Sequence, residues 1–257
     1  MDSNPYESPA SANEAAIRSG SSGKRLFFTM LALLGGMGLL VLLMLPALRI
    51  APEAGRRAHC TNNMKQITLG WLNYQSRYQA FPPAYTVDEN GKPLHSWRTL
   101  LLPYIEQTPL YERIDLTKPW NDPANANVFE TPVAVYTCPT SRLVRGYTTY
   151  LAVVGQDVCL LPTESRKLSD ITDDHAKTLM VIEVDKEHSV PWMAPTDADE
   201  KMILSLMSSD SFPHPGGMNA VFVDGHGAFL QTDTEAKNLR AMISIAGHDD
   251  DETFEED

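Results

Sequence analysis

The sequence predicts an α+β protein in which a long N-terminal transmembrane and stem helix packs on an antiparallel sheet. Three observations support this fold class. The run LFFTMLALLGGMGLLVLLML, from Leu26 to Leu45, carries no charge over about 20 residues, which is the length of a membrane-spanning helix. The apolar residues of the next segment mostly fit one side of a helix. Short strand-like runs come only afterwards, and this order indicates α+β rather than alternating βαβ units.

The uncharged run has two alternative interpretations, a buried core helix and a cleaved signal peptide. A core helix would show a polar face, and the run has none. A signal peptide has an apolar region of about 7–15 residues, whereas this run is longer and ends in PALRIAPEAGRR. We therefore expect a retained single-pass anchor over residues 25–48. Its orientation stays open by the positive-inside rule, because basic residues stand both before and after it: Arg18, Lys24 and Arg25, then Arg49, Arg56, Arg57 and Lys65.

The rest of the chain divides by composition. Residues 1–24, rich in Ser, Asn, Pro and Ala, read as a disordered tail, and residues 248–257 read as an acidic disordered tail. Residues 49–80 are expected to form an amphipathic stem helix that continues the anchor, kinked at Pro46 and Pro52. The apolar side of the stem is expected to contain Met64, Ile67, Leu69, Trp71, Leu72 and Tyr74.

Residues 81–247 are expected to form the α+β globular domain. The segment Ser96–Ile114 predicts a helix broken at Pro103 and Pro109, and the segment Asn121–Pro132 predicts a polar loop. Strands are predicted at Val133–Cys138, Thr148–Val154, Thr178–Val184, Asn219–Val223 and Gly227–Gln231.

The stretch PHPGGMNAVFVDGHG, residues 213–227, combines a turn with polar groups. Asp224-Gly225 between two apolar runs is a strong signal for a tight hairpin turn. One interpretation of the polar groups is a metal site formed by His214, Asp224 and His226. The plainer interpretation has Asp224 and Asn219 bonding backbone amides, His214 packing beside the sheet and His226 facing solvent. The plainer one is favoured, because the spacing does not place the three ligands on one helical face.

Several function classes find little support. The net charge is −12, with much of it in the C-terminal tail, and no basic stripe indicates nucleic-acid binding. No GxSxG elbow is present, and neither His175 nor His188 has a catalytic motif around it. The spacing of the three cysteines, Cys60, Cys138 and Cys159, is not that of a zinc ribbon, and it leaves open which pair would form a disulfide outside the cytoplasm. We expect no enzymatic activity and no cofactor.

Four tryptophans, Trp71, Trp97, Trp120 and Trp192, are present. Packing in the core or at its rim is the favoured interpretation. The alternative is that Trp97, Trp120 and Trp192 contact a carbohydrate or another solute, with PWMAPTD, residues 191–197, as an exposed aromatic loop.

Nine blocks in order resemble the bacterial domain-of-unknown-function family DUF1559, whose N-termini resemble those of prepilins and type II secretion pseudopilins. The blocks, between about Leu42 and Leu230, are LMLPALRIAPEAGRRAHCTNNMKQITLGWLNYQ, FPPA, SWRTLLLPYIEQTPLYERID, KPWND, YTCPT, TTYLAVVG, SDITDDHAKTLMVIEV, PWMAPTD and HPGGMNAVFVDGHGAFL. The resemblance implies a single-pass anchor in the cytoplasmic membrane, a pilin-like stem helix and a domain facing the periplasm or the cell exterior. It implies a disulfide between Cys60 and Cys138, which leaves Cys159 as the odd thiol.

The chain departs from the prepilin pattern at the span and from the family pattern at the turn. Gly23 is followed by KRLFFTMLALL, and no acidic residue lies in the span, so the membrane carboxylate expected to meet a neighbouring subunit's amine in pilus assembly is missing. His226 stands where the family usually has Ser, which weakens the metal interpretation further.

These observations leave three hypotheses. The first is a non-enzymatic, membrane-anchored, pseudopilin-like envelope protein whose partners are the membrane and other pilin-like or secretion-system proteins, with no nucleic acid and an unknown ligand. The second is a membrane-tethered binder of a solute or carbohydrate. The third is a metal-dependent hydrolase at His214, Asp224 and His226.

Overall fold

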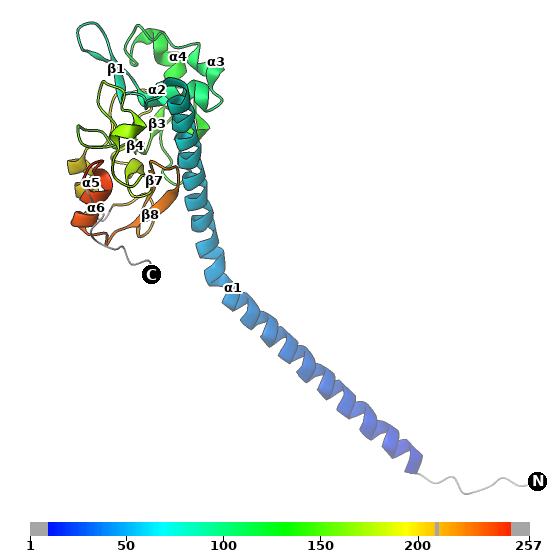
Figure 1. Cartoon of the computed structure of the whole chain (residues 1–257). Coiled ribbons are helices and arrows are strands. Elements are labelled where there is room, and N and C mark those ends of the chain that lie inside the picture. Colours follow the sequence, from blue (N-terminus) through cyan, green and yellow to red (C-terminus); the bar gives the residue numbers. More distant parts are fainter. Residues whose placement is uncertain (1–9, 209–210, 248–257) are drawn as a thin grey trace, which may run out of the picture. The chain divides into compact units, whose positions relative to one another are not determined.

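The computed structural model describes residues 10–208 and 211–247 (Figure 1). The chain divides into two compact units, Met1–Glu53 and Ala54–Asp257, so the boundary lies slightly beyond the predicted anchor end at residue 48. Helix α1 (Ala10–Tyr78) begins in the first unit and ends in the second. Its first residues, 10–24, lie within the segment expected to be a tail. Residues 1–9 and the predicted acidic tail lie outside the described residues.

The first unit contains a helical segment that is long and apolar enough to cross a membrane, Gly23–Leu40. None of this segment is buried in the protein, and Leu33, for example, is 68% exposed. A core helix would cover these side chains, since burial of apolar surface is what holds such a helix in place. The segment therefore fits a membrane anchor or a signal sequence, and not a core helix.

The part of α1 in the second unit buries one stripe of side chains. Cys60, Met64, Ile67 and Trp71 follow one another at intervals of four, three and four residues, and all are fully buried. This spacing places them on one face of a helix. Leu69 was expected on the same side but is 58% exposed. It precedes Trp71 by two residues, and two residues rotate a helix by about 200°, so Leu69 points away from the buried face.

The main sheet has four antiparallel strands in the order β4-β5-β7-β8. Two smaller antiparallel pairs are β1 with β2 and β3 with β6. The predicted α+β class with an antiparallel sheet is thereby confirmed. The strand bounds are β1 Tyr85–Val87, β2 Pro93–Ser96, β3 Tyr147–Thr148, β4 Tyr150–Ala152, β5 Leu179–Glu183, β6 Val190–Pro191, β7 Gly217–Phe222 and β8 Gly227–Gln231.

Both faces of the main sheet are buried. Alternate side chains of β7 show this, because Val221 packs in the core that contains the α1 stripe, while Ala220 and Phe222 pack in a second core. The second core includes Leu206 of α5 (Glu200–Met207) and Leu239 of α6 (Ala236–Ile243). Helices α5 and α6 lie side by side (Figure 1), and the sheet is covered by α1 on one face and by these two helices on the other.

The predicted broken helix over Ser96–Ile114 is confirmed in outline. It consists of α2 (Trp97–Leu101), the 3-10 turn η1 (Leu102–Tyr104) and α3 (Thr108–Tyr111). Each proline occupies the first turn of a new element, where its missing N–H has no helical partner to lose. Gly70 of α1 faces this segment, and a Cβ there would lie 2.6 Å from Ile105 Cγ2.

Two predicted elements are wrong. The segment Val133–Cys138 is not a strand, since it forms the 3-10 turn η3 (Ala134–Tyr136); its buried side chains pack inward without a neighbouring strand, and the Tyr136 N–H bonds back to the Val133 carbonyl. The predicted loop Asn121–Pro132 contains two short helical elements. These are the 3-10 turn η2 (Pro123–Asn125) and helix α4 (Ala126–Phe129). The Asp122 carboxylate caps η2 by accepting the Ala124 N–H. A further 3-10 turn, η4, spans Leu168–Asp170.

Candidate functional site: a buried disulfide, glutamate and histidine

The predicted metal trio does not converge. His214 precedes β7, whereas Asp224 and His226 lie in the turn that follows it. The six residues of β7 span roughly 20 Å at about 3.3 Å per residue, so His214 is at the opposite end of the β7–β8 hairpin. Among the described residues, the three do not form a cluster of metal-binding side chains.

The Asp224-Gly225 turn is a surface hairpin. Gly225 has a φ of 96°, a left-handed conformation that glycine accepts readily, and its N–H bonds to the Phe222 carbonyl. The Asp224 carboxylate accepts the backbone N–H of His226 at 3.0 Å and lies 2.7 Å from its Nδ1. Burial acts to raise the pKa of Asp224, but these bonds outweigh it and lower the pKa below its usual value. Both side chains are more than a third exposed, so the pair stabilises a turn in solvent.

The tryptophans proposed as ligand contacts are mostly internal. Trp97 is fully buried and packs edge-on against Trp71 with 4.9 Å between ring centroids. Trp192 is 2% exposed, stacks on Tyr136 and donates its indole N–H to the Phe129 carbonyl. Trp120 is partly buried and packs edge-on against Phe129. The structure therefore gives core packing as the role of Trp97 and Trp192.

The predicted exposed loop of residues 191–197 is also wrong, because a buried arginine draws it inward. The Arg98 guanidinium donates to the carbonyls of Trp192, Ala194 and Thr196 at 2.8–3.2 Å. Its Nη1 lies 2.6 Å from Asp197 Oδ1, and both side chains are almost completely buried. Burial raises the pKa of Asp197, and Arg98 opposes that rise. This network fixes the loop to α2. The arginine in the run SWRTLLL gave no sign in the sequence that it would bind residues 191–197.

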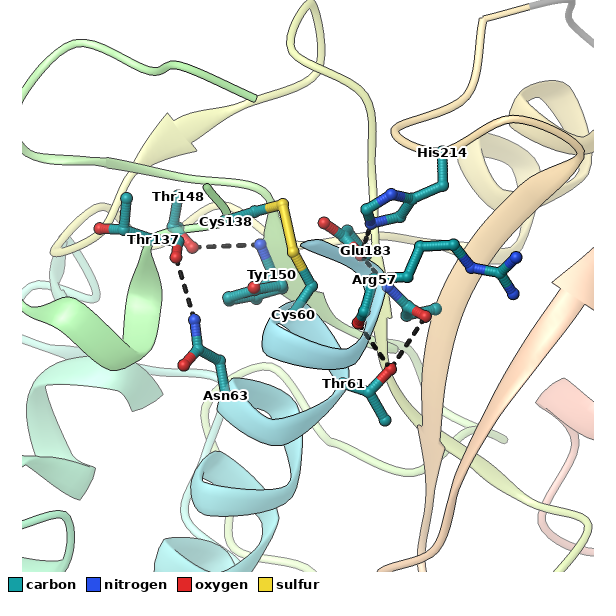
Figure 2. The surroundings of a disulfide bond; sticks show 11 residues. Arg57, Cys60, Thr61, Asn63, Thr137, Cys138, Thr148, Tyr150, Glu183 and His214 are labelled. Carbon is teal, nitrogen blue, oxygen red and sulfur yellow. Dashed lines mark hydrogen bonds and ion pairs between the residues drawn. A yellow bond between two sulfur atoms is a disulfide. The ribbon is translucent and has the colours of Figure 1, made fainter. Parts of the chain in front are cut away.

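The structure brings four side chains together beneath the α1 stripe (Figure 2). Cys60 on α1 is bonded to Cys138, which follows η3, and their Cα atoms are 5.4 Å apart. Glu183 is the last residue of β5, and His214 lies in the segment before β7. All four are buried, and one potential ligand atom from each lies within 4.8 Å of the others. Cys159 is buried elsewhere as a free thiol, and burial raises its pKa to about 12, so it is unreactive at neutral pH.

Hydrogen bonds fix the orientation of Glu183 within this cluster. Its Oε2 accepts the Asn219 side-chain N–H at 2.6 Å and lies 3.2 Å from His214 Nε2. Asn219 is held in turn by Thr61 of α1, whose hydroxyl donates to Asn219 Oδ1 at 3.1 Å. The other oxygen of Glu183, Oε1, is buried and has no hydrogen-bond partner among the residues that the structure describes. A buried carboxylate oxygen without a partner is costly, so this atom calls for a physical explanation.

The cluster lies next to Tyr150 on one strand, and a surface cavity lined by Arg57 approaches it. Tyr150 of β4 pairs with Glu183 across the sheet, and burial, together with the charge of Glu183, raises the pKa of the Tyr150 phenol well above its usual value. A surface cavity of about 300 Å³ reaches Thr61 and Asn219 from the outside. Arg57 lines this cavity, with its guanidinium 3.6 Å above the Phe229 ring.

Sequence reasoning missed Glu183. It ends the run LMVIE, which is buried throughout, and the pattern indicates only a core strand. The sequence did hold one signal for Glu183: a carboxylate at the end of a buried strand predicts a buried partner, since Glu is almost never fully buried unless it is paired. His214 was singled out, but for the wrong partners.

The fold and the buried cluster define an α+β domain preceded by an apolar helical segment, and within this domain a disulfide links the last part of α1 to the segment after η3. Residues 50–156 match the family model described as "Protein of unknown function (DUF1559)", so the resemblance to that family is confirmed over these residues. The match includes Cys60 and Cys138 and ends before Glu183 and His214. No curated protein and no solved structure matches the chain.

Proposed function

We propose that this protein is a non-enzymatic, single-pass membrane protein of the cell envelope, pseudopilin-like in plan, whose domain lies outside the cytoplasm and interacts with other envelope proteins. The observation that carries the proposal is the segment Gly23–Leu40, apolar and without burial, within a helix that continues into the domain. A polypeptide of this kind lowers its free energy by inserting the segment into lipid.

Three further observations support the orientation and the class. The Cys60–Cys138 disulfide fits an oxidising compartment, because cytoplasmic thiols are kept reduced. Because His214 lies apart from Asp224 and His226, these three residues give no support to a metal-dependent hydrolase. The burial of Trp97 and Trp192 likewise removes the support for a carbohydrate groove. The proposal includes other pilin-like or secretion-system proteins as partners, and this part of it rests on the anchor and the stem helix.

Membrane fractionation with matched variants tests the anchor. The tagged full chain should remain in the membrane pellet after alkaline extraction. Leu33→Arg places a charge in the span, which costs about 2.5–3.5 kcal/mol of insertion free energy at the helix centre, and should move a substantial share of the protein to the soluble fraction. Leu69→Arg is the matched control, because Leu69 is similarly exposed but lies outside the span. It should fractionate like the wild type.

Two further results bear on the same proposal. Protease added to spheroplasts should digest the domain while leaving cytoplasmic proteins intact. N-terminal sequencing distinguishes an anchor from a cleaved signal sequence. A mature chain that begins after Arg49 and is wholly soluble would contradict the proposal, and so would a domain protected from protease in intact spheroplasts.

A further inference from the structure

We propose that the four clustered side chains form a redox-controlled zinc site: when the Cys60–Cys138 disulfide is reduced, the two thiolates, His214 Nε2 and the Glu183 carboxylate bind one Zn²⁺. The inference rests on the cluster alone and does not depend on the membrane anchor. Cysteine, histidine and glutamate are the side chains that zinc prefers, and four protein ligands make a closed structural site.

The geometry is close to that of a tetrahedral zinc site. Zinc lies about 2.0–2.3 Å from N, O and S ligands, so two ligands of one tetrahedron lie about 3.3–3.8 Å apart. His214 Nε2 already lies 3.2 Å from the Glu183 carboxylate, at its Oε2 atom, and one potential ligand atom from each of the four side chains lies within 4.8 Å of the others. The main change that binding requires is the separation of the two sulfur atoms once their bond is broken.

The unpartnered oxygen of Glu183 is a second, independent observation. Glu183 Oε1 is buried and accepts no hydrogen bond from residues 10–208 or 211–247, and a cation at the cluster would satisfy it. Oε2 meanwhile keeps its bond from Asn219, which Thr61 orients. Such outer partners hold a ligand in place and typically affect metal affinity by about 10–100-fold.

A surface cavity approaches the cluster. The cavity of about 300 Å³ is lined by Thr61 and Asn219, the two residues that connect to Glu183. The cavity therefore reaches a side chain, Asn219, that contacts Glu183 directly.

The redox step balances with an external dithiol as the reductant. One thiolate of the dithiol attacks one sulfur of the Cys60–Cys138 bond, which releases the other cysteine as a thiolate and leaves a mixed disulfide. The second thiol of the dithiol then displaces the attacked cysteine sulfur from that mixed disulfide. The dithiol is oxidised to a disulfide, and Cys60 and Cys138 each gain one electron and one proton. Zinc binding then releases two protons, because thiolates are the ligands. In the oxidised state the sulfurs are bonded to each other and only His214 and Glu183 remain, which is too few ligands for a structural zinc site.

The test uses the full chain in mild detergent, with Zn²⁺ and Co²⁺ as probes. The protein is prepared oxidised, or reduced with a phosphine under nitrogen. We expect the reduced protein to bind one equivalent of Zn²⁺ against a chromophoric chelator, and to give the visible absorption of tetrahedral, thiolate-bound cobalt with Co²⁺. The oxidised protein should bind at least 100-fold more weakly and give no such absorption.

Variants connect the signal to the cluster. Cys138→Ser should clearly weaken the cobalt–thiolate absorption, because one of the two thiolate ligands is lost, and Glu183→Gln should weaken zinc binding at least tenfold. Cys159→Ser removes a buried thiol outside the cluster, and His226→Ala removes an exposed imidazole, so both should bind like the wild type. Near-ultraviolet circular dichroism of each variant reports whether the domain remains folded.

Three outcomes overturn the proposal. One is a reduced, folded protein that takes up no zinc. Another is binding that Cys138→Ser or Glu183→Gln leaves unchanged, which would place the metal elsewhere. The third is loss of the fold on reduction that added Zn²⁺ does not restore, since a site that binds metal through folded-state ligands must stabilise the fold.

Discussion

Removal of the Cys60–Cys138 disulfide should destabilise the domain by several kcal/mol. The bond joins residues separated by 78 positions. In the chain-entropy model a loop of that length restricts the unfolded chain by about 15 cal/mol/K, or about 4.5 kcal/mol at 25 °C. The variant Cys60→Ala/Cys138→Ala tests this value, because alanine introduces no buried hydroxyl at either fully buried position.

The assay is urea unfolding of the oxidised full chain in detergent, followed by fluorescence of the buried tryptophans. With a slope of about 2 kcal/mol per molar urea, a loss of about 4.5 kcal/mol lowers the midpoint by roughly 2 M. Cys159→Ala is the matched control, since Cys159 is equally buried but free; it measures the cost of one Cys-to-Ala truncation. A midpoint that falls by no more than twice the control's shift would show that the cross-link contributes nothing, and would refute the reasoning.

Three further predictions concern stability and use the same unfolding assay. Gly217→Ala should lower the free energy of unfolding by at least about 2 kcal/mol, because Gly217 has a φ of 154° and a Cβ there would lie 2.0 Å from a carbonyl oxygen of β8. Gly91→Ala is the control, with a φ of 76° and open space around it, and should lower that free energy by about 1 kcal/mol. Equal losses in the two variants would contradict the argument. Arg98→Met leaves a buried carboxylate unpaired and should cost about 3–5 kcal/mol, whereas Arg240→Met breaks an exposed pair and should cost less than about 1 kcal/mol. Burial acts to raise the pKa of Asp185, but hydrogen bonds from the neighbouring histidine lower it below 3.8. Its contribution is therefore present above the ordinary pKa and lost as the pH falls below that value, so Asp185→Asn should lose stability at pH 6 and little at pH 2, and an equal loss at both would contradict the sign.

The main strands were predictable because their signal is local. The run Thr178–Val184 is apolar and rich in β-branched residues, and the structure has β5 at Leu179–Glu183. The return strand at Gly227–Gln231 follows from the Asp224-Gly225 turn, and β8 has the predicted bounds. In both segments the local pattern and the tertiary packing require the same conformation.

Elements that depend on distant partners were not predictable. Val133–Cys138 has the composition of a strand, but no strand among the described residues pairs with it, and the N–H groups of Tyr136 and Thr137 bond back to the carbonyls of Val133 and Ala134 in a 3-10 turn. Residues 191–197 look like an exposed loop until Arg98, about a hundred positions earlier, is seen to bind their carbonyls. The site was missed for the same reason. Only the fold brings Glu183 next to His214, 31 positions later.

The two proposed states of the cluster differ in how many parts of the domain they join. Cys60 is the first residue of the buried stripe on α1, so a bond at this position holds the helix where it begins to pack on the domain. The disulfide connects α1 to the segment after η3. Zinc would connect these two elements and also β5 and the segment before β7, because Glu183 and His214 would share the ion. Either state fixes the start of the packed helix, and an empty reduced state fixes it least. The domain should therefore lose stability on reduction in a chelator and regain it when zinc is added.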